Sequence, residues 1–455
     1  MMAEMIPFLL FICTCAVLLA GYPVALSLAG TALLFAAAGS YSGHFDGAYL
    51  QALPNRLFGI MGNTTLVAVP LFVMMGVMLE KSRLSEDLLE SMADLLGGLR
   101  NGLGISVILV GALLAASTGI VGATVVTMGL MSLPTLLKRG YSASEASGMI
   151  CATGTLGQII PPSIALVLLG DTLSNAYQQA QLNMGIFAPK TVSVGDLFVG
   201  AIVPGLLLVC LYCLYVLLMV KPQRATIAID EAFDTRLRRA FKNLLPPILL
   251  IFAVLGSILT GAATPTEAAG VGAFGAILLA MIKGQLDWQN LRAAVQSTTQ
   301  VTSMVFMILI GAAIFSLVFR GFGGEQRVAE FFQQMPGGLF GATLLVMVVI
   351  FVLGFILDFI EITFVVVPIV APILLAMGLD PIWLGVMIAI NLQTSFLTPP
   401  FGFALFYLRG VAPETVNTAD MYRGVLPYIG LQVMLMLMLA LFPAIATWLP
   451  SVVYP

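Results

Sequence analysis

Charged residues are scarce in this 455-residue sequence: they make up 9% of the chain, against 60% for hydrophobic residues. A soluble domain normally carries about a quarter charged residues, because its surface must face water. So little charge excludes a soluble protein. The single histidine, His44, also excludes a metal centre built on histidine ligands.

Motifs for nucleotide binding and hydrolysis are missing as well. No Walker, Rossmann, HExxH or GxSxG pattern occurs, so the chain encodes no ATPase. An enzyme needs a poised acid, base or metal, and we expect none here. No nucleic-acid partner is expected. The cysteines all lie in apolar segments and are expected to be buried hydrophobes, not disulfides or ligands: Cys13, Cys15, Cys151, Cys210 and Cys213.

Long apolar runs recur from end to end. Runs of roughly 17–25 residues can cross a bilayer as helices, whereas barrel strands would alternate in polarity. We therefore expect an all-α polytopic membrane protein whose first run is a retained helix, not a signal peptide. The expected spans are 5–20, 24–38, 66–80, 145–170, 196–220, 245–260, 264–283, 300–319, 383–408 and 425–449. The segments 223–243 and 284–298 are expected to be amphipathic surface connectors.

The basic residues set the orientation, because they favour the cytoplasmic side of a membrane. With the loop 221–243 in the cytoplasm, four of the 19 basic residues fall outside, which leaves 15 inside. This predicts a bacterial inner-membrane protein with both termini in the periplasm. The four outer basic residues are Arg56, Lys190, Arg320 and Arg327.

Two apolar segments have the wrong length for simple spans. The first, 103–137, would be roughly 50 Å long as one helix, too long for one crossing and too short for two. A break at 117–124 leaves legs of about 14 residues, which suit a re-entrant hairpin. The second, 339–377, repeats this arrangement with a break at 354–358 that continues to Glu361. We name them hairpin 1 and hairpin 2.

The two halves of the sequence also align. At an offset of 238, eight pairs match: Pro134/Pro372, Leu136/Leu374, Leu137/Leu375, Gly140/Gly378, Met149/Met387, Ile150/Ile388, Pro161/Pro399 and Pro162/Pro400. At 241–242 the matches are Pro23/Pro265, Gly30/Gly272, Asp46/Asp287 and Leu50/Leu291. Five crossings separate the repeat starts, and an odd number inverts the second repeat. Inverted repeats with interrupted helices are typical of secondary transporters.

A helix that must break follows each hairpin, at 152–163 (ATGTLGQIIPPS) and 391–400 (NLQTSFLTPP). Paired prolines lack N–H groups and free carbonyls one turn back, and hydrocarbon cannot satisfy these carbonyls. One interpretation is that they coordinate sodium, while helix N-termini meet an anionic substrate. The alternative is an ordinary kink whose Ser and Thr side chains satisfy their own backbone.

Candidate residues follow from this interpretation. Because no Lys or Arg lies in any break, hydroxyls, amides and backbone would hold the substrate: Ser117, Thr118, Thr155, Gln158, Ser163, Asn391, Gln393, Thr394 and Thr398. Candidate Na⁺ ligands are Ser117, Gly122, Thr153, Gly157, Gly354, Asp358, Thr394 and Ser395. A carboxylate within the membrane is costly, so Asp358 is expected to hold a cation or titrate. Glu361 either shares this role or snorkels, and both could instead sit in a water-filled opening.

Four motifs resemble the large membrane subunit of TRAP transporters, the tripartite ATP-independent periplasmic transporters, over nearly the whole chain. They are 261–269 (GAATPTEAA), 157–163 (GQIIPPS), 354–358 (GFILD) followed by 368–372 (PIVAP), and 397–402 (LTPPFG).

The resemblance implies sodium-driven uptake of organic acids. Such subunits work with a small four-helix membrane subunit and a soluble periplasmic binding protein. Neither is fused to this chain, so it is expected to be inactive alone. The family's sodium sites map onto 117–124, 153–157, 354–358 and 391–398.

The implied fold is of the elevator type, in which a transport domain slides against a scaffold. We divide the chain into scaffold helices of repeat 1 (1–100), a first transport half (101–171), linking and scaffold helices (172–338), a second transport half (339–410) and a C-terminal helix (411–455). Alternatives are a sodium- or proton-coupled anion carrier that works alone and, less in keeping with the inverted breaks, a channel or a membrane-embedded enzyme.

Overall fold

A computed structural model describes residues 2–82, 84–99, 101–220 and 233–454 of the chain. Throughout these ranges the regular elements are helices. Eight are long and apolar enough to cross a membrane, or nine if one bent pair counts as a single span. The expected all-α membrane fold is confirmed.

The first repeat supplies the hairpin α6–α7, the interrupted helix α8–α9 and the helices around them. Its elements are α1 (Met2–Leu19), α2 (Val24–Tyr41), η1 (Gly47–Ala52), α3 (Leu53–Met61), η2 (Thr65–Val67), α4 (Ala68–Lys81), α5 (Leu84–Leu95), α6 (Gly102–Thr118), α7 (Val121–Lys138), α8 (Ala143–Thr155), η3 (Leu156–Gln158), α9 (Ile164–Asn183) and α10 (Val194–Met219).

The second repeat supplies the same parts in the same order. Its elements are α11 (Phe233–Leu259), α12 (Pro265–Ile282), α13 (Trp288–Gly321), α14 (Gly324–Gln333), α15 (Gly338–Leu353), α16 (Phe359–Glu361), the π-helical η4 (Ile362–Val366), α17 (Val367–Ala376), α18 (Pro381–Leu397), α19 (Phe403–Val411) and α20 (Thr418–Leu441). A last helix, α21 (Ala444–Val453), follows.

Helix starts recur at the sequence offsets. Asp46 and Asp287, 241 residues apart, each cap a helix with the side chain accepting a backbone N–H. Ser142 and Asp380, 238 residues apart, do the same for α8 and α18. Capping residues satisfy N–H groups that have no partner within the helix. The repeat therefore holds at the level of individual helix caps.

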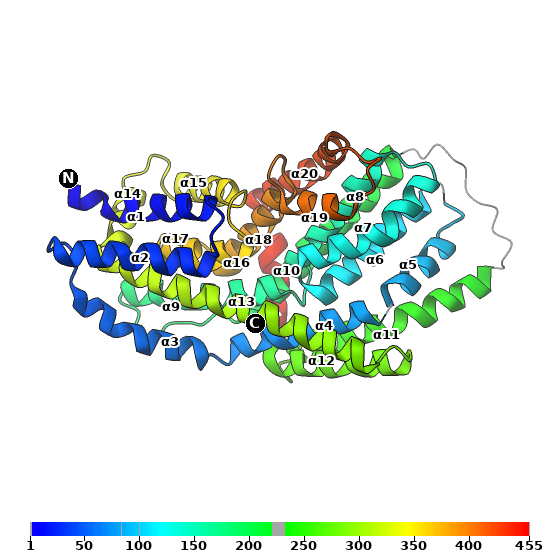
Figure 1. The fold of residues 1–455 in the computed structure, drawn as a ribbon, viewed down its shortest axis with the longest axis horizontal. Helices are drawn as coiled ribbons and strands as arrows, with labels where there is room; N and C mark the ends of the chain where they lie inside the picture. The colour runs from blue at the N-terminus through cyan, green and yellow to red at the C-terminus, as the bar shows by residue number, and fades with distance from the viewer. Residues whose placement is uncertain (1, 83, 100, 221–232, 455) are drawn as a thin grey trace.

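Packing between the repeats is reciprocal. Helix α2 packs on α13, and its counterpart α12 packs on α4 (Figure 1). Likewise α9 packs on α17, and α19 packs on α7. Each contact between a helix of repeat 1 and a helix of repeat 2 therefore recurs between the equivalent helices of the opposite repeats, as a two-fold relation requires. The molecule is elongated in Figure 1, with α2 toward one end, α5 and α11 toward the other and α18 between them.

Both hairpins form, with tighter geometry than predicted. The legs of hairpin 1 have 17 and 18 residues instead of about 14. Its break is only 119–120, because the residues on either side are already helical. The legs are longer because the left-handed Gly119 turns the chain within two residues. Hairpin 2 breaks at 354–358, and Glu361 lies in the returning helix.

Three other predictions need correction or limitation. The segment 284–298 is no separate connector, because α13 runs unbroken for 34 residues. Its counterpart in repeat 1 is divided and bends by 52° between α3 and α4. The stretch 411–455 holds two helices, α20 and α21, and not one, because Phe442-Pro443 interrupts them. The basic loop residues within 221–232 lie outside the described ranges.

Candidate functional site

The tip of hairpin 1 is a glycine turn lined by hydroxyls. Gly119 ends α6 in the left-handed conformation (φ 62°), which glycine adopts without a Cβ clash. Ser117 and Thr118 donate their hydroxyl protons to the Leu114 carbonyl at 2.8 and 3.0 Å. Across the turn the Thr118 and Thr124 hydroxyl oxygens lie 2.7 Å apart.

The tip of hairpin 2 carries two carboxylates in a capping box. The Phe359 N–H donates to Asp358 Oδ1 at 2.7 Å, and the Asp358 N–H donates to Glu361 Oε2 at 3.0 Å. Glu361 is buried, whereas Asp358 is partly exposed. Because each carboxylate has about four lone-pair sites, both keep acceptor capacity after capping the helix.

The two tips differ in charge at one equivalent position. Asp358 caps α16, and the residue 238 earlier, Ile120, occupies the same N-cap position before α7. An isoleucine side chain can neither accept a hydrogen bond nor hold a cation. The negative charge therefore belongs to one half of an otherwise matched pair.

The first helix break lies at the Pro161-Pro162 pair. These prolines cannot donate to the carbonyls four residues back, those of Gly157 and Gln158. The Ser163 hydroxyl donates to both carbonyls instead, at 2.7 and 3.4 Å. At this break the structure therefore supports the alternative of an ordinary kink, in which a side-chain hydroxyl satisfies nearby backbone carbonyls.

The second break lacks that hydroxyl. Phe401 stands where repeat 1 has Ser163, and it cannot donate a hydrogen bond. The Ser395 carbonyl receives the Thr398 N–H at 3.1 Å. The Phe396 carbonyl receives no hydrogen bond from the described residues. The Phe396 carbonyl is therefore a candidate ligand of the kind that the paired prolines predict.

Each hairpin tip packs against the break of its own repeat. At Gly354 an added Cβ would lie 2.1 Å from Ser395 Oγ, so the hairpin 2 backbone touches α18 directly. At Gly157 an added Cβ would lie 3.2 Å from the Ala115 carbonyl oxygen of hairpin 1. Glycine at both positions lets irregular backbone from two elements converge.

A polar pair joins the two halves. Gln393 Nε2 donates to Thr155 Oγ1 at 3.3 Å, and these residues are 238 apart, the offset of the repeat. Equivalent residues of two repeats can touch only close to the axis that relates them. Gln432 Nε2 of α20 donates to the Tyr212 hydroxyl of α10 at 2.8 Å. The same nitrogen lies 3.5 Å from Thr155 Oγ1.

This centre is buried and not fully satisfied. Gln393 and Gln432 are 0% exposed, and Gln158 is 2% exposed. Their three Oε1 atoms have no hydrogen-bond partner within the described ranges. A buried acceptor without a partner costs about 1–3 kcal/mol. The centre can therefore gain stability by receiving a donor or a cation.

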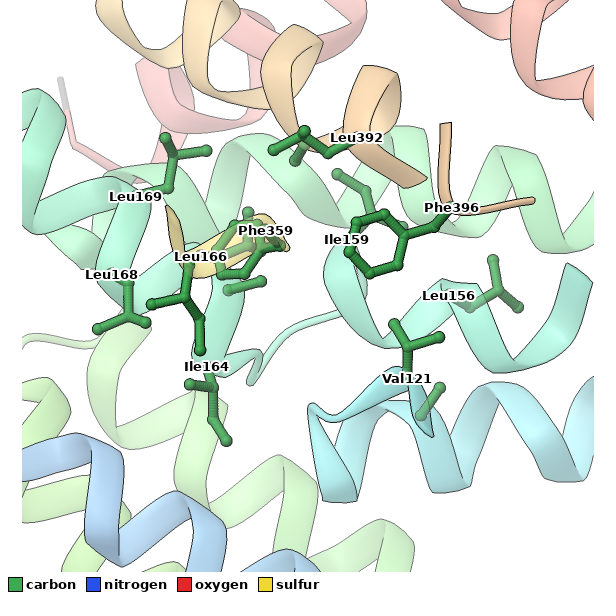
Figure 2. Packing of buried hydrophobic residues seen from close by; sticks show 14 of the residues in the cluster. Val121, Leu156, Ile159, Ile164, Leu166, Leu168, Leu169, Phe359, Leu392 and Phe396 are labelled. Carbon is green, nitrogen blue, oxygen red and sulfur yellow. The ribbon is translucent and has the colours of Figure 1, made fainter. Parts of the chain in front are cut away.

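Apolar side chains surround these polar groups. Figure 2 shows Ile159 and Leu166 of repeat 1 in one buried cluster with Phe359 and Phe396 of repeat 2. Because this cluster excludes water, electrostatic interactions next to it are stronger than in bulk solvent.

The predicted site residues divide into two groups. One group faces another element: Ser117, Thr118, Thr155, Gly157, Gly354, Gln393 and Ser395. Asn391 also does so, because its Nδ2 donates to the Met347 carbonyl of hairpin 2 at 2.7 Å. Asp358 caps the returning leg of hairpin 2 by accepting the Phe359 N–H.

The hydroxyls of three other predicted residues bond within their own helices, although Thr153 also packs against Gly111 of hairpin 1, and Gly122 faces α19. Thr153, Thr394 and Thr398 donate to carbonyls four residues back at 2.6–2.7 Å. A hydroxyl that donates in this way keeps its oxygen lone pairs for a cation. Gly122 packs against the Tyr407 ring, where an added Cβ would lie 2.8 Å from a ring carbon.

Sequence reasoning missed two further polar groups. Gln432 stands alone in an apolar span, and a lone amide there is a signal that could have been read. Asn63, between α3 and α4, donates from Nδ2 to both oxygens of Asp171 on α9 at 3.1 Å. These two residues are distant in sequence, and no spacing rule connects them.

Inverted repeats, paired re-entrant hairpins and paired interrupted helices define a protein of the secondary-transporter class. The sequence model described as "Tripartite ATP-independent periplasmic transporter, DctM component" matches residues 11–445. The chain belongs to this family, whose curated relatives are transporter permeases and not enzymes.

Three relatives and one solved structure illustrate the similarity. The C4-dicarboxylate TRAP transporter large permease protein DctM of Vibrio cholerae is 29% identical, covering 97% of each chain. The sialic acid permease SiaM of Vibrio cholerae is 27% identical over 95% of this chain and 96% of its own. The ectoine permease TeaC of Halomonas elongata is also 27% identical, over 96% and 97%.

In structure the chain resembles the YdaH transporter of Alcanivorax borkumensis. The TM-score is 0.59 at 16% sequence identity, covering 96% of this chain and 98% of that one. This similarity concerns the fold.

Proposed function

We propose that this chain is the large permease of a sodium-coupled tripartite transporter that imports a small organic acid. The observation that carries the proposal is the close packing of each hairpin on the broken helix of its own repeat, Gly354 on Ser395 and Ala115 on Gly157. In transporters such interruptions supply carbonyls to ions and helix N-termini to anionic substrates. The names of the relatives, for C4-dicarboxylate, sialic acid and ectoine, favour a small polar organic substrate.

Sodium fits the oxygens available at these places. Hydroxyls and carbonyls surround the tips and breaks, with Asp358 as a fixed charge near hairpin 2. The described residues hold no cluster of three or more His, Cys, Asp or Glu side chains, so a neutral-oxygen site for a monovalent cation is favoured over a divalent centre. One sodium ion moving inward through 100 mV supplies about 2.3 kcal/mol.

The substrate would meet hydroxyls, amides and helix N-termini. The N-terminal ends of α7 and α9 lie at irregular backbone and carry positive dipole ends. Since no Lys or Arg lies in a tip or a break, backbone N–H groups and side chains such as Asn391 and Gln393 would hold the carboxylate. We infer that the hairpins and broken helices move together against the remaining helices, as an elevator.

We also propose that the chain lies in the bacterial inner membrane with both termini in the periplasm, and that it works with two other components. A small membrane subunit and a periplasmic binding protein would complete the transporter. The second candidate is a carrier that works alone, which the fold of the YdaH relative leaves open.

Reconstitution separates the two candidates. Proteoliposomes would hold this chain alone, with its small subunit, or with the small subunit and the binding protein, under a sodium gradient. We expect uptake only in the complete system and only with sodium in place of potassium. Full uptake by the chain alone would refute the tripartite assignment.

A further inference from the structure

A large cavity runs beside the returning leg of hairpin 2. It has a volume of about 560 Å³ and lies between α3, α9, α13 and the returning leg of hairpin 2. Its lining includes Arg56, Asp171, Ser316, Arg320 and Pro368.

The cavity continues along the same leg. A second cavity of about 450 Å³ shares Gln179, Pro368 and Pro372 with the first and reaches Met377 at the end of the leg. At its other end the first cavity reaches Phe364, three residues from Glu361. The combined space, which we name the outer crevice, extends from the end of hairpin 2 to the vicinity of its tip.

Two arginines and two carboxylates line the outer crevice, Arg56 and Arg320 with Asp171 and Glu325. Arg56 forms no ion pair with any described residue, whereas Arg320 pairs with Glu325 through Nε at 2.9 Å and Nη2 at 2.7 Å. The carboxylate that lines the first cavity, Asp171, accepts both of its hydrogen bonds from Asn63. Arg56 is therefore the cation with unused donors.

A guanidinium in such a place favours carboxylates. Its fork of N–H groups matches a carboxylate with two parallel bonds. A cleft with low-dielectric walls also focuses the field of its charges and raises the local concentration of anions. Both effects are missing at the tips and breaks, which have no basic side chain.

We propose that the outer crevice is the path by which substrate reaches hairpin 2, and that Arg56, with Arg320, captures its carboxylate on the way. This inference rests on the proposed function, because it assigns an anionic substrate. It adds a site to the pathway: capture by a guanidinium in the crevice precedes transfer to backbone and hydroxyl groups at the tips. Arg320 contributes less, since Glu325 occupies its donors.

Thiol labelling tests the access and the charge of the crevice together. The background variant lacks the five native cysteines and carries Ser316→Cys in the cavity wall, in right-side-out vesicles holding the complete transporter. The probes are membrane-impermeant methanethiosulfonates, one with a sulfonate and one with a trimethylammonium group. The measured quantity is the ratio of the anionic to the cationic labelling rate.

We expect Ser316→Cys to be labelled from outside. Arg56→Gln should lower the ratio roughly fivefold, because one unit charge that lines the same cavity is removed, whereas Arg56→Lys should preserve it. Lys190→Gln, on an exposed residue outside the cavity, is the matched control and should leave the ratio unchanged. No labelling, or a ratio insensitive to Arg56→Gln, overturns the proposal.

Protection tests carboxylate capture. Succinate, pyruvate and N-acetylneuraminate are added as probes, with succinamide as the neutral control. At least one acid should slow labelling, with a half-protecting concentration about fivefold higher in Arg56→Gln. Protection by none of them, or equal protection in both variants, refutes capture at Arg56. Loss of binding-protein docking in Arg56→Gln with an unchanged labelling ratio would assign Arg56 to a protein contact instead.

These results are separable from the proposed function. Labelling and protection that behave as expected, in a complete system without sodium-driven uptake, would refute sodium-coupled import and leave the crevice assignment intact. Sodium-driven uptake, together with labelling that shows an uncharged or closed crevice, would support sodium-coupled import and refute the crevice assignment.

Discussion

Single residues decide how each break satisfies its own backbone. In each break the paired prolines leave two carbonyls without a backbone N–H donor. The sequence predicts this, because proline has no N–H group. It could not predict that Ser163 would satisfy both carbonyls in repeat 1 while Phe401 leaves the Phe396 carbonyl bare in repeat 2. The ion-binding capacity of the two breaks is therefore unequal.

Asp358→Asn tests the fixed charge at hairpin 2. Asparagine also caps helices well, so folding and expression should stay close to wild type. The loss of charge should raise the sodium concentration for half-maximal uptake about tenfold, equivalent to roughly 1.4 kcal/mol. Sodium activation curves of the complete transporter measure this, and an unchanged curve would remove Asp358 from the site.

Gly354→Ala tests the contact between hairpin 2 and its break. The new Cβ would lie 2.1 Å from Ser395 Oγ, so the tip must move. We expect uptake to fall at least about tenfold, with partial recovery when Ser395→Gly is added to make room. Gly430→Ala, on a helical glycine with nothing within 4 Å, is the control and should transport normally. Wild-type uptake by Gly354→Ala would show that the tip need not lie so close.

At the scale of elements, hairpins and interrupted helices were largely predictable. Apolar length, paired prolines and the repeat offset located all four irregular segments. The break of hairpin 1 was predicted to be too long, because α6 continues through Thr118 and the left-handed Gly119 then turns the chain at once. The 34-residue α13 was also missed, since its polar first turns looked like a surface connector.

Replacing Pro161-Pro162 or Pro399-Pro400 with Ala-Ala tests the breaks as elements. Alanine restores the N–H group and has the highest helix propensity, so each helix should straighten through the break. We expect uptake to be abolished while the variants still insert in the membrane. Normal uptake by both would mean that the breaks are only kinks.

At the scale of the whole molecule, the two-fold relation was predictable but its contacts were not. The sequence showed the offset of 238 through pairs of identical residues in its two halves. That Thr155 and Gln393 would meet at the axis, with Gln432 beside them, required the packing of α8, α18 and α20. The contact of Asn63 with Asp171 likewise joins elements that no sequence pattern relates.

Crosslinking tests relative motion of the two parts. The Asn63→Cys/Asp171→Cys pair joins the α3–α4 junction to α9, across the proposed sliding boundary. The Gly129→Cys/Leu408→Cys pair joins α7 to α19 on the same side of it, where a Cβ at Gly129 would lie 2.9 Å from Leu408 Cδ1. In a background without the native cysteines, oxidation of the first pair should stop uptake and reduction should restore it. Oxidation of the second should have little effect, and transport with the first pair closed would contradict an elevator motion.

The most direct test of the central claim, that the tips and breaks bind sodium, is the thermal unfolding of the purified chain titrated with NaCl or KCl at constant ionic strength. We predict a saturable stabilisation by sodium alone, worth about 2.7 kcal/mol at a hundredfold excess over the dissociation constant. The sodium concentration that gives half of this stabilisation should be higher in Asp358→Asn and unchanged in Gly430→Ala. Identical curves in NaCl and KCl for the wild-type chain would contradict the account.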